Sequence, residues 1–546
     1  MKHLGNFAGS LLPADIHARF RRQIGDEVLF ICATDEHGTP AELAAAEAGR
    51  EVADFCREQH EIQAAIYSRL DLSFDHFGRS SSSQNHVLTQ HFFHCLDENG
   101  FIEERVLDQV YSPEDRRFLP DRYIIGTCPH CGFERARGDQ CEHCTRPLDP
   151  VDLIAPRSAL SGSDRLEIRP SRHLFLRQSA LVGELETWIA SRKGWPPLVT
   201  SIARKWLNEG IQDRCITRDL DWGVPVPKPG FEGKVFYVWF DAPIAYIAAT
   251  QEWCDAEIGR DWRQWWWDAH DVDYRQFLGK DNVPFHAVSF PCTLLGSREP
   301  WKTVDVVQGV NWLTYEGGKF STSQRRGIFL DQALALLPAD YWRWWLASNA
   351  PESSDTDFTF ERFAADINHD LSDTSGNFVS RTLKFVESRY GGIVPGAGAI
   401  DAPERELSLQ IEAHLASLRA HHENLSVRKA AEEVRQIWRL GNGYLAREAP
   451  WSTHVNDPVR TAVVIRTAVT LIEIAAQAVW SFIPATAERV LAAVGHKPGQ
   501  PGWPTARCIL ASGGSERRKV AAPPPLFPKL ASDWVEIQKI TFRGST

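Results

Sequence analysis

The sequence predicts an α/β fold in which an open parallel sheet is split by a cysteine-rich insertion and followed by an α-helical bundle. Residues 13–24 have helical spacing and precede the apolar run EVLFICATDEHG, an order of helix and buried strand that is typical of parallel sheets. Residues 99–213 have the pattern of short strands and turns around four paired cysteines. From residue 361 helical periodicity dominates, so the C-terminal part is predicted to be a bundle.

The chain of 546 residues is too long for one core, because domains average ~150 residues. Strand-like stretches return at 234–247 and 274–290, which predicts that the sheet resumes after the insertion. One apolar stripe of the bundle stands out before Pro484: Leu471, Ile474, Ala475, Ala478, Val479 and Phe482. The predicted divisions are 1–98 and 214–306 for the two halves of the sheet domain, 99–213 for the insertion, 307–360 for a loop region, 361–510 for the bundle and 511–546 for a tail.

Composition restricts location and partners. The net charge of −11 argues against a general polyanion binder, although a local basic cluster could still bind nucleic acid. No apolar run approaches the ~20 residues of a membrane span, and the start MKHLGNFAGS lacks the core of a signal peptide. We therefore expect a cytoplasmic protein with reduced thiols and no membrane partner.

Four of the eleven cysteines are paired: Cys128, Cys131, Cys141 and Cys144 form a C-x2-C-x9-C-x2-C arrangement. Each pair can hold one side of a metal ion, and four thiolates complete a tetrahedral shell around Zn²⁺. Because such a shell has no open position, the predicted role is structural. The alternative, four buried or redox cysteines, explains the regular spacing less well.

Two segments have the composition of phosphate-binding elements. KHLGNFAG places a histidine, a glycine and a polar residue at a helix start, where free N–H groups and the helix dipole favour anions. His3 could add a hydrogen bond or a positive charge. In the second segment, YEGGKFSTSQRRG at 315–327, two glycines precede a lysine, and three small hydroxyl residues and then two arginines follow. It predicts a flexible loop that closes over a ligand with several anionic oxygens.

Together these segments resemble the two signature motifs of class I aminoacyl-tRNA synthetases. ATDEHGTP, ITRDLDWGVPVP, VFYVWFDAPIAYI, FLGKDNVPFH and the four-cysteine knuckle resemble methionyl-tRNA synthetase, in order, from His3 to about residue 495. The chain is thus identified as a member of that family or a divergent paralogue. The resemblance implies a Rossmann-type parallel sheet split by a zinc knuckle, and an anticodon-binding helical bundle. It also implies that residues 307–360 contain the signature loop and contact the tRNA stem.

The resemblance implies three groups of site residues. The catalytic group is His3, Gly5, Asn6, Lys319, Ser321, Thr322 and Ser323. The substrate group is Asp35, Arg218, Trp239, Ala242, Pro243, Tyr246, Asp281 and His286, with either Asp281 or Asp35 holding the substrate ammonium. The anticodon group is Asn377, Arg381 and Trp451. Asn377 and Arg381 lie one helical turn apart, and Trp451 could stack on an unpaired base.

The implied reaction is attack of the methionine carboxylate on ATP, with Mg²⁺ bridging the phosphates, followed by transfer to tRNA(Met) with its CAU anticodon. Positioning and charge stabilisation would do most of the work. No appended dimerisation domain is evident, so we expect a monomer.

The sequence departs from the family at two places. Thr322 stands where the signature loop has lysine, and loss of one such cation costs ~10²–10³ in rate, unless Arg325 or Arg326 replaces it. The family also has a strand before the first motif, so we expect the natural start to lie upstream of Met1. These departures leave two alternatives: a tRNA-independent ligase that passes an adenylated amino acid to a small N-hydroxylated amine, and a non-catalytic tRNA-binding protein.

Overall fold

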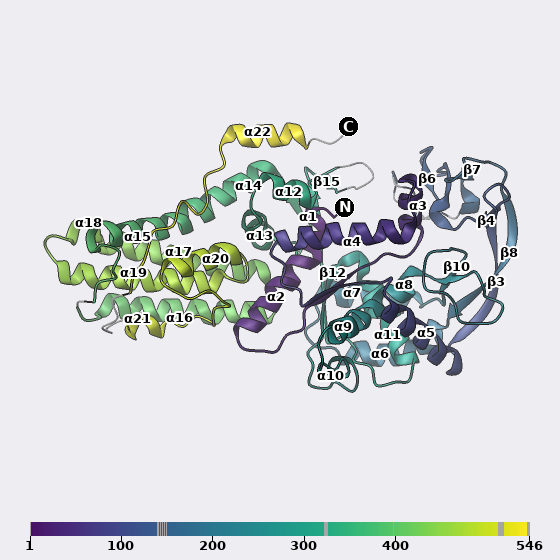
Figure 1. Cartoon of the computed structure of the whole chain (residues 1–546), viewed down its shortest axis with the longest axis horizontal. Coiled ribbons are helices and arrows are strands. Elements are labelled where there is room, and N and C mark those ends of the chain that lie inside the picture. Colours follow the sequence, from purple (N-terminus) through teal and green to yellow (C-terminus); the bar gives the residue numbers. More distant parts are fainter. Residues whose placement is uncertain are drawn as a thin grey trace.

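The molecule has three parts along its long axis (Figure 1). A computed structural model describes residues 2–138, 141, 143–144, 146, 148, 150–320, 326–396, 398–511 and 518–542. A helical bundle forms one end, a mixed α/β part forms the middle, and the strand-rich insertion lies at the opposite end. The predicted α/β class with a helical C-terminal part is confirmed.

The parallel strands of the middle part form two pairs. β1 (Ile31–Thr34) pairs with β2 (His76–Arg79), and the chain between these two strands includes α4 (Val52–Arg69). β12 (Arg275–Gly279) pairs with β13 (Val306–Val310). Within the described residues no backbone ladder joins the two pairs. Instead α9 (Ala245–Asp255) packs on the first pair, and η1 (Phe7–Leu11) packs on the second. The N-terminal motif therefore lies directly against β12.

Two stretches predicted as strands are largely helical. In 234–247 only β11 (Val235–Phe236) is a strand, and α8 (Val238–Asp241), η5 (Ala242–Ile244) and α9 follow it. In 274–290 the strand β12 ends at Gly279, and η6 (Lys280–Asn282) and η7 (Phe285–Ser289) continue the chain. The prediction was wrong there because a short apolar run does not distinguish a buried strand from a buried helix.

The insertion contains two antiparallel sheets, followed by the helices α6 (Val182–Ser191) and α7 (Pro197–Glu209). β3 (Ile102–Ser112) and β8 (Glu167–Leu176) form a long ladder that carries the insertion away from the middle part (Figure 1). The second sheet has the order β6-β5-β7, with β5 at Ile124–Thr127, β6 at Ala136–Arg137 and β7 at Ile154–Ser158. The cysteine motif begins directly after β5, so the knuckle lies beside this second sheet.

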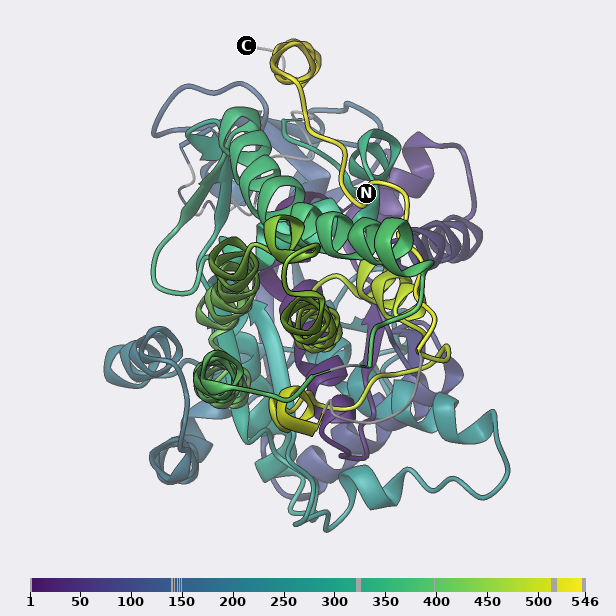
Figure 2. The same cartoon turned by 90° about the vertical axis from the view of Figure 1, so that its left-hand side faces the viewer.

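The bundle helices run side by side, as the view along them shows (Figure 2). They are α15 (Asn377–Tyr390), α16 (Ala402–Glu423), α17 (Val427–Glu448), α19 (Pro458–Val479) and α20 (Pro484–Ala493). The predicted stripe is confirmed, since each of its six residues is buried. In the part of the chain that the structure describes, α19 alone is long and apolar enough to cross a membrane, but 89% of that stretch is buried inside the bundle.

A buried arginine connects the bundle to the middle part. Arg343 lies on α13 (Ala339–Ser348), is fully buried, and donates to Asp15 Oδ2 of α2 (Leu12–Gln23) at 2.6 Å. The rest of its guanidinium donates to four backbone carbonyls, at residues 70 and 71 of the middle part and at residues 481 and 482 of the bundle. Because an unpaired buried charge is costly, this network fixes how the two parts meet.

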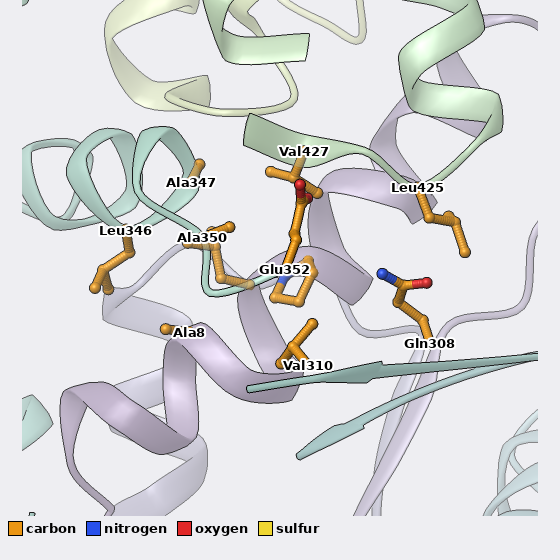
Figure 3. A pocket seen from close by; sticks show the side chains of 11 residues that line it. Ala8, Gln308, Val310, Leu346, Ala347, Ala350, Glu352, Leu425 and Val427 are labelled. Carbon is orange, nitrogen blue, oxygen red and sulfur yellow. The ribbon is translucent and has the colours of Figure 1, made fainter. Parts of the chain in front are cut away.

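A cavity of about 10 Å³ lies at the same junction, between η1, β13, α13 and the start of α17 (Figure 3). Its walls are mostly apolar, with Gln308 and Glu352 as polar members. Burial raises the pKa of Glu352, whose carboxylate accepts the Arg428 backbone N–H at 3.3 Å. This volume fits about one water molecule, so the cavity is a packing feature and not a substrate site.

Candidate active site

The N-terminal motif forms the first turn of a long helical segment. α1 (Leu4–Asn6) begins at His3, whose Nδ1 accepts the Asn6 backbone N–H at 3.3 Å, while Asn6 Oδ1 accepts the His3 N–H at 3.1 Å. The His3 ring stacks on Phe320, with centroids 4.7 Å apart and planes 11° apart. A Cβ atom at Gly5 would lie 3.0 Å from the His3 ring, so glycine allows this close approach.

The stack joins two segments about 315 residues apart in the chain. Leu4 N–H donates to Ile328 O at 3.1 Å, and Leu330 N–H donates to Lys2 O at 3.0 Å, which aligns the two backbones. Burial, followed by the nearby Lys2 ammonium, lowers the pKa of His3 to about 4. His3 is therefore neutral at physiological pH and offers a hydrogen bond instead of a positive charge.

Lys319 lies in an aromatic and cationic cluster that the sequence did not predict. Its Nζ lies 4.1 Å from the Trp312 ring centroid, and Lys280 Nζ lies at the same distance from that ring. Trp312 Nε1 donates to Asp281 Oδ1 at 3.3 Å, and Lys280 pairs with Asp355 at 2.8 Å. Trp312 thus connects the predicted loop lysine to the predicted substrate residue Asp281.

Strand alternation could have identified Trp312. β14 (Leu313–Tyr315) and β15 (Gly318–Lys319) form a hairpin in which Thr314 pairs with Lys319. Residue 312 lies two positions before Thr314, on the same face, and such a diagonal neighbour is within reach of a long side chain.

The other predicted loop residues, Ser321, Thr322 and Ser323, lie outside the described residues, as does Arg325. Arg326 is described, and its guanidinium donates to the backbone carbonyls of Tyr315 and Glu316, at 3.2 Å each. In this arrangement Arg326 holds the base of the hairpin together.

The predicted substrate residues Trp239, Tyr246 and His286 lie on neighbouring short helices. Trp239 stacks on Phe285, with ring centroids 3.8 Å apart. Tyr246 O–H lies 2.9 Å from His286 Nε2, and His286 Nδ1 lies 3.0 Å from Asn282 O. Because a carbonyl only accepts, Nδ1 carries the proton and Nε2 accepts from the tyrosine. Burial lowers the pKa of His286, which agrees with this neutral form.

Ala242 and Pro243 lie in η5, between the helices that carry Trp239 and Tyr246. Arg218, on β10 (Thr217–Arg218), has its guanidinium carbon 4.0 Å from the Tyr237 ring centroid, at the start of α8. The sequence prediction included Arg218 but missed this tyrosine and Phe285. Both are aromatics beside predicted residues, so neighbouring positions in the motifs could have suggested them.

Asp35 follows β1: part of the residue is open to solvent, while protein atoms surround the rest of its carboxylate and weaken its acidity. Its enclosure by protein atoms, and then the nearby Asp241 carboxylate, raise the pKa of Asp35 to about 7. Asp241 itself is buried and pairs with His37 Nδ1 at 2.7 Å. The His37–Asp241 pair is buried near Asp35, whereas Asp35 itself is exposed to solvent and can contact a ligand.

The predicted anticodon residues lie in the bundle, on α15 and on a short helix after α17, away from this cluster (Figure 1). The Arg381 guanidinium carbon lies 4.3 Å from the ring centroid of Trp451, on α18 (Pro450–Thr453). Trp451 is 45% exposed, and Asn377 is exposed one turn before Arg381. The structure therefore brings two of the three residues into contact and leaves all three open to solvent.

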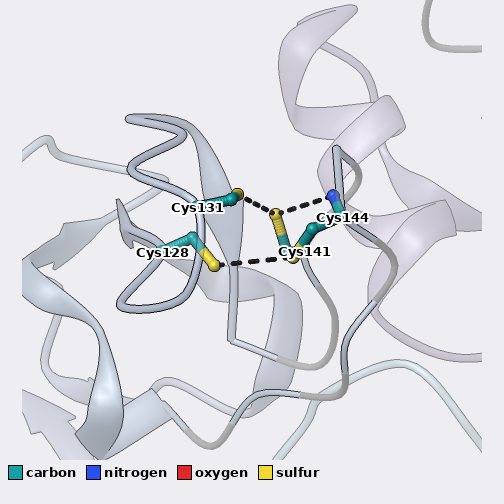
Figure 4. Close-up of side chains that lie close together, drawn as sticks. All are labelled: Cys128, Cys131, Cys141 and Cys144. Atoms are coloured by element: carbon teal, nitrogen blue, oxygen red, sulfur yellow. Dashed lines mark hydrogen bonds between the residues drawn. The ribbon is translucent and has the colours of Figure 1, made fainter.

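The four predicted zinc ligands converge (Figure 4). Cys128 Sγ lies 3.8 Å from Cys144 Sγ, Cys131 Sγ lies 3.6 Å from Cys141 Sγ, and all four sulfurs are within 4.8 Å of one another. Tetrahedral Zn²⁺ with Zn–S bonds of ~2.3 Å places its sulfurs ~3.8 Å apart, so the donor set and its spacing are compatible with zinc.

Two family models together match most of the chain. Residues 1–383 match the model described as tRNA synthetases class I (M), and residues 394–546 match the anticodon binding domain of methionyl tRNA ligase. Among curated proteins, a methionine–tRNA ligase of Streptomyces avermitilis is 54% identical, over 100% of this chain and 97% of its own length. A methionine–tRNA ligase of Cereibacter sphaeroides is 58% identical, over 92% of this chain and 90% of its own length.

The fold is also that of solved structures. The Mycobacterium tuberculosis methionyl-tRNA synthetase in complex with methionyl-adenylate aligns with a TM-score of 0.77, at 24% identity, over 97% of each chain. A second structure of that synthetase, in its free state, aligns with a TM-score of 0.71 at 21% identity.

Proposed function

Because the chain belongs to the class I tRNA synthetase (M) family, we propose that it is a methionine–tRNA ligase, which activates methionine with ATP and transfers it to tRNA(Met). The observation that most supports this proposal is the contact between the two signature segments. His3 stacks on Phe320, the residue that follows Lys319, although the sequence separates the two segments by more than 300 residues.

In the activation step, ATP would place its phosphates between the α1 turn and the β14–β15 hairpin. The neutral His3 and the Asn6 side chain would supply hydrogen bonds, and Gly5 would let the phosphates approach the backbone. Lys319 would stabilise the charge that develops as pyrophosphate leaves, and Ser321, Thr322 and Ser323 would add smaller donors. Mg²⁺ would enter with ATP and neutralise phosphate charge.

Methionine would bind where Trp239, Ala242, Pro243, Tyr246 and His286 meet. A thioether packs well on aromatic edges, and the Tyr246–His286 hydrogen bond fixes the orientation of one wall. The substrate ammonium would pair with the Asp35 carboxylate, which solvent reaches, while the exposed Asp281 is held by Trp312. Arg218 would lie near the aminoacyl group.

Transfer would depend on a second, distant contact. We assign anticodon binding to the 361–510 bundle, where Asn377, Arg381 and Trp451 would read the CAU anticodon by stacking and hydrogen bonding. Residues 307–360 would contact the tRNA stem between the two sites. The sheet halves 1–98 and 214–306 would hold the substrates, and 511–546 would be a tail.

The insertion, 99–213, would hold one structural Zn²⁺ through Cys128, Cys131, Cys141 and Cys144. The ion would crosslink the two turns that carry the cysteine pairs, which are too short to form a hydrophobic core by themselves. We further propose that the protein acts as a cytoplasmic monomer.

The exposed Arg381–Trp451 pair weighs against the tRNA-independent alternative, because a ligase that uses a small amine has no need of a base-stacking surface.

Charging assays test the transfer step. The full chain should form methionyl-tRNA with a transcript that carries CAU, and should lose most of that activity with a transcript whose anticodon alone is changed. Equal charging of both transcripts would overturn the anticodon assignment. Activation of methionine without charging of either transcript would favour the tRNA-independent alternative.

A further inference from the structure

Three side chains of the types that bind metal ions converge outside the sites described above. His91 and Cys95 lie one turn apart on α5 (Ser83–Glu98), and Glu299 lies in the segment that follows α11 (Phe290–Gly296). His91 Nε2 lies 2.7 Å from Glu299 Oε2, and Cys95 Sγ lies 3.6 Å from His91 Nε2. The three ligand atoms are all within 4.8 Å of one another.

These separations are close to those of a bound ion. Tetrahedral zinc with bonds of ~2.0 Å to nitrogen and oxygen and ~2.3 Å to sulfur places its ligand atoms ~3.3–3.6 Å apart. The sulfur–nitrogen distance already has this value. The nitrogen–oxygen distance is shorter because a hydrogen bond spans it, and a small rotation of either side chain would open it.

The carboxylate is oriented from outside the cluster. Trp301 Nε1 donates to Glu299 Oε2 at 2.9 Å, and Trp301 in turn stacks on Trp262. Metal-binding carboxylates are commonly held by such an outer hydrogen bond. Among the described residues, no lysine or arginine forms an ion pair with Glu299, so His91 is its one ionic partner there.

The cluster is accessible to an ion. The His91 side chain is 41% exposed and that of Glu299 25%, and Cys95 is partly exposed. Three protein ligands leave a fourth tetrahedral position free for water. A thiolate, a carboxylate and a neutral imidazole carry two negative charges together, which balance a divalent cation.

We propose that His91, Cys95 and Glu299 form a second metal site, separate from the four-cysteine cluster, which takes a divalent ion of the zinc class. On binding, the Cys95 S–H bond breaks and its proton passes to solvent, the proton on His91 Nε2 is transferred through solvent to Nδ1 so that the imidazole stays neutral, and sulfur–metal and nitrogen–metal bonds form. The ion ties α5 to the segment between α11 and β13. Because α5 also packs against η5, the site stabilises one wall of the proposed methionine pocket.

The test counts cobalt ions bound to the full chain. Protein stripped of metal and reduced is equilibrated with excess Co²⁺, separated from free ion, and analysed for metal content and for thiolate-to-cobalt absorption. The wild-type chain should bind one ion more than Cys95→Ser or His91→Gln, and each variant should lose the absorption of a single thiolate. Because the difference between chains is measured, failure of the four-cysteine site would not obscure the result.

His94→Gln is the matched control, because His94 lies on the same helix, is exposed, and belongs to neither cluster. It should bind as many ions as the wild-type chain. Glu299→Gln keeps the shape of the third ligand but removes its charge, and should weaken cobalt binding at least tenfold. Equal metal content in wild type, Cys95→Ser and His91→Gln would overturn the proposal, as would a loss of the same ion in His94→Gln.

Discussion

The middle part of the molecule and the outer end of the bundle hold their candidate functional side chains in different ways. In the middle part, the half-buried His3 stacks on the half-buried Phe320, and the exposed Lys319 lies against the half-buried ring of Trp312. At the outer end of the bundle, Arg381 and Trp451 contact each other but remain exposed. Chemistry at phosphates needs positions fixed in advance, whereas a surface that stacks on an unpaired base needs access.

The largest effect is expected at the junction between these parts. Arg343→Ala leaves the buried Asp15 with Arg19 as its remaining cationic partner and removes the side-chain donor of the backbone carbonyls of residues 70, 481 and 482, so it should lower the free energy of unfolding by about 3–5 kcal/mol. Urea unfolding followed by tryptophan fluorescence measures this. Arg419→Ala is the control, since the exposed Arg419–Glu423 pair is worth about 0.3–0.5 kcal/mol. A similar loss in both variants would contradict the proposed role of the junction.

Lys319→Ala should reduce activation by ~10²–10³ because it removes a cation that stabilises leaving pyrophosphate. The measurement is methionine-dependent ATP–pyrophosphate exchange without tRNA. Lys205→Ala, at an exposed lysine on α7 (Pro197–Glu209), should exchange normally. If Lys319→Ala retained full exchange, the proposed role of the hairpin would be wrong.

Trp451→Ala should weaken recognition of tRNA by the bundle without affecting activation of methionine. Loss of one stacked base costs about 1–3 kcal/mol, so kcat/KM for tRNA charging should fall roughly 5–150-fold. Exchange without tRNA should be unchanged. Val455→Ala, at a neighbouring residue with 85% exposure, serves as the control. A similar fall in ATP–pyrophosphate exchange would show that Trp451 also affects the activation site in the middle part.

The smallest expected effect is the pH dependence of kcat/KM for methionine. Since the pKa of Asp35 is raised to about 7, its carboxylate gains a proton as pH falls through that value, and attraction for the substrate ammonium is lost. Between pH 8 and pH 6, kcat/KM for methionine in the exchange assay should fall roughly tenfold, as for a single titrating group. Asp35→Asn should be uniformly weak and show no such slope. An unchanged slope in that variant would assign the titration to another group.

Sequence patterns identified groups of residues that are close in the sequence more readily than contacts between segments that are far apart in the sequence. Spacing alone identified the four cysteines, and helical periodicity identified the buried stripe of α19, because both are local patterns. The stacking of His3 on Phe320 and the position of Trp312 depend on how distant segments pack. Local spacing does not record such contacts.

The same limit explains the errors and omissions. Apolar runs at 234–247 and 274–290 suggested strands, but burial against β1 and β13 accommodates short helices equally well. Cys95 was one of seven scattered cysteines in the sequence. Its neighbour Glu299 comes from a segment about 200 residues later, so only the fold reveals the cluster.

The most direct test of the account is amino-acid-dependent ATP–pyrophosphate exchange by the full chain, with each of the twenty amino acids in turn and no tRNA. The account predicts exchange with methionine far above that with any other amino acid, despite Thr322 in the signature loop. Stronger exchange with another amino acid, or none with methionine, would contradict it.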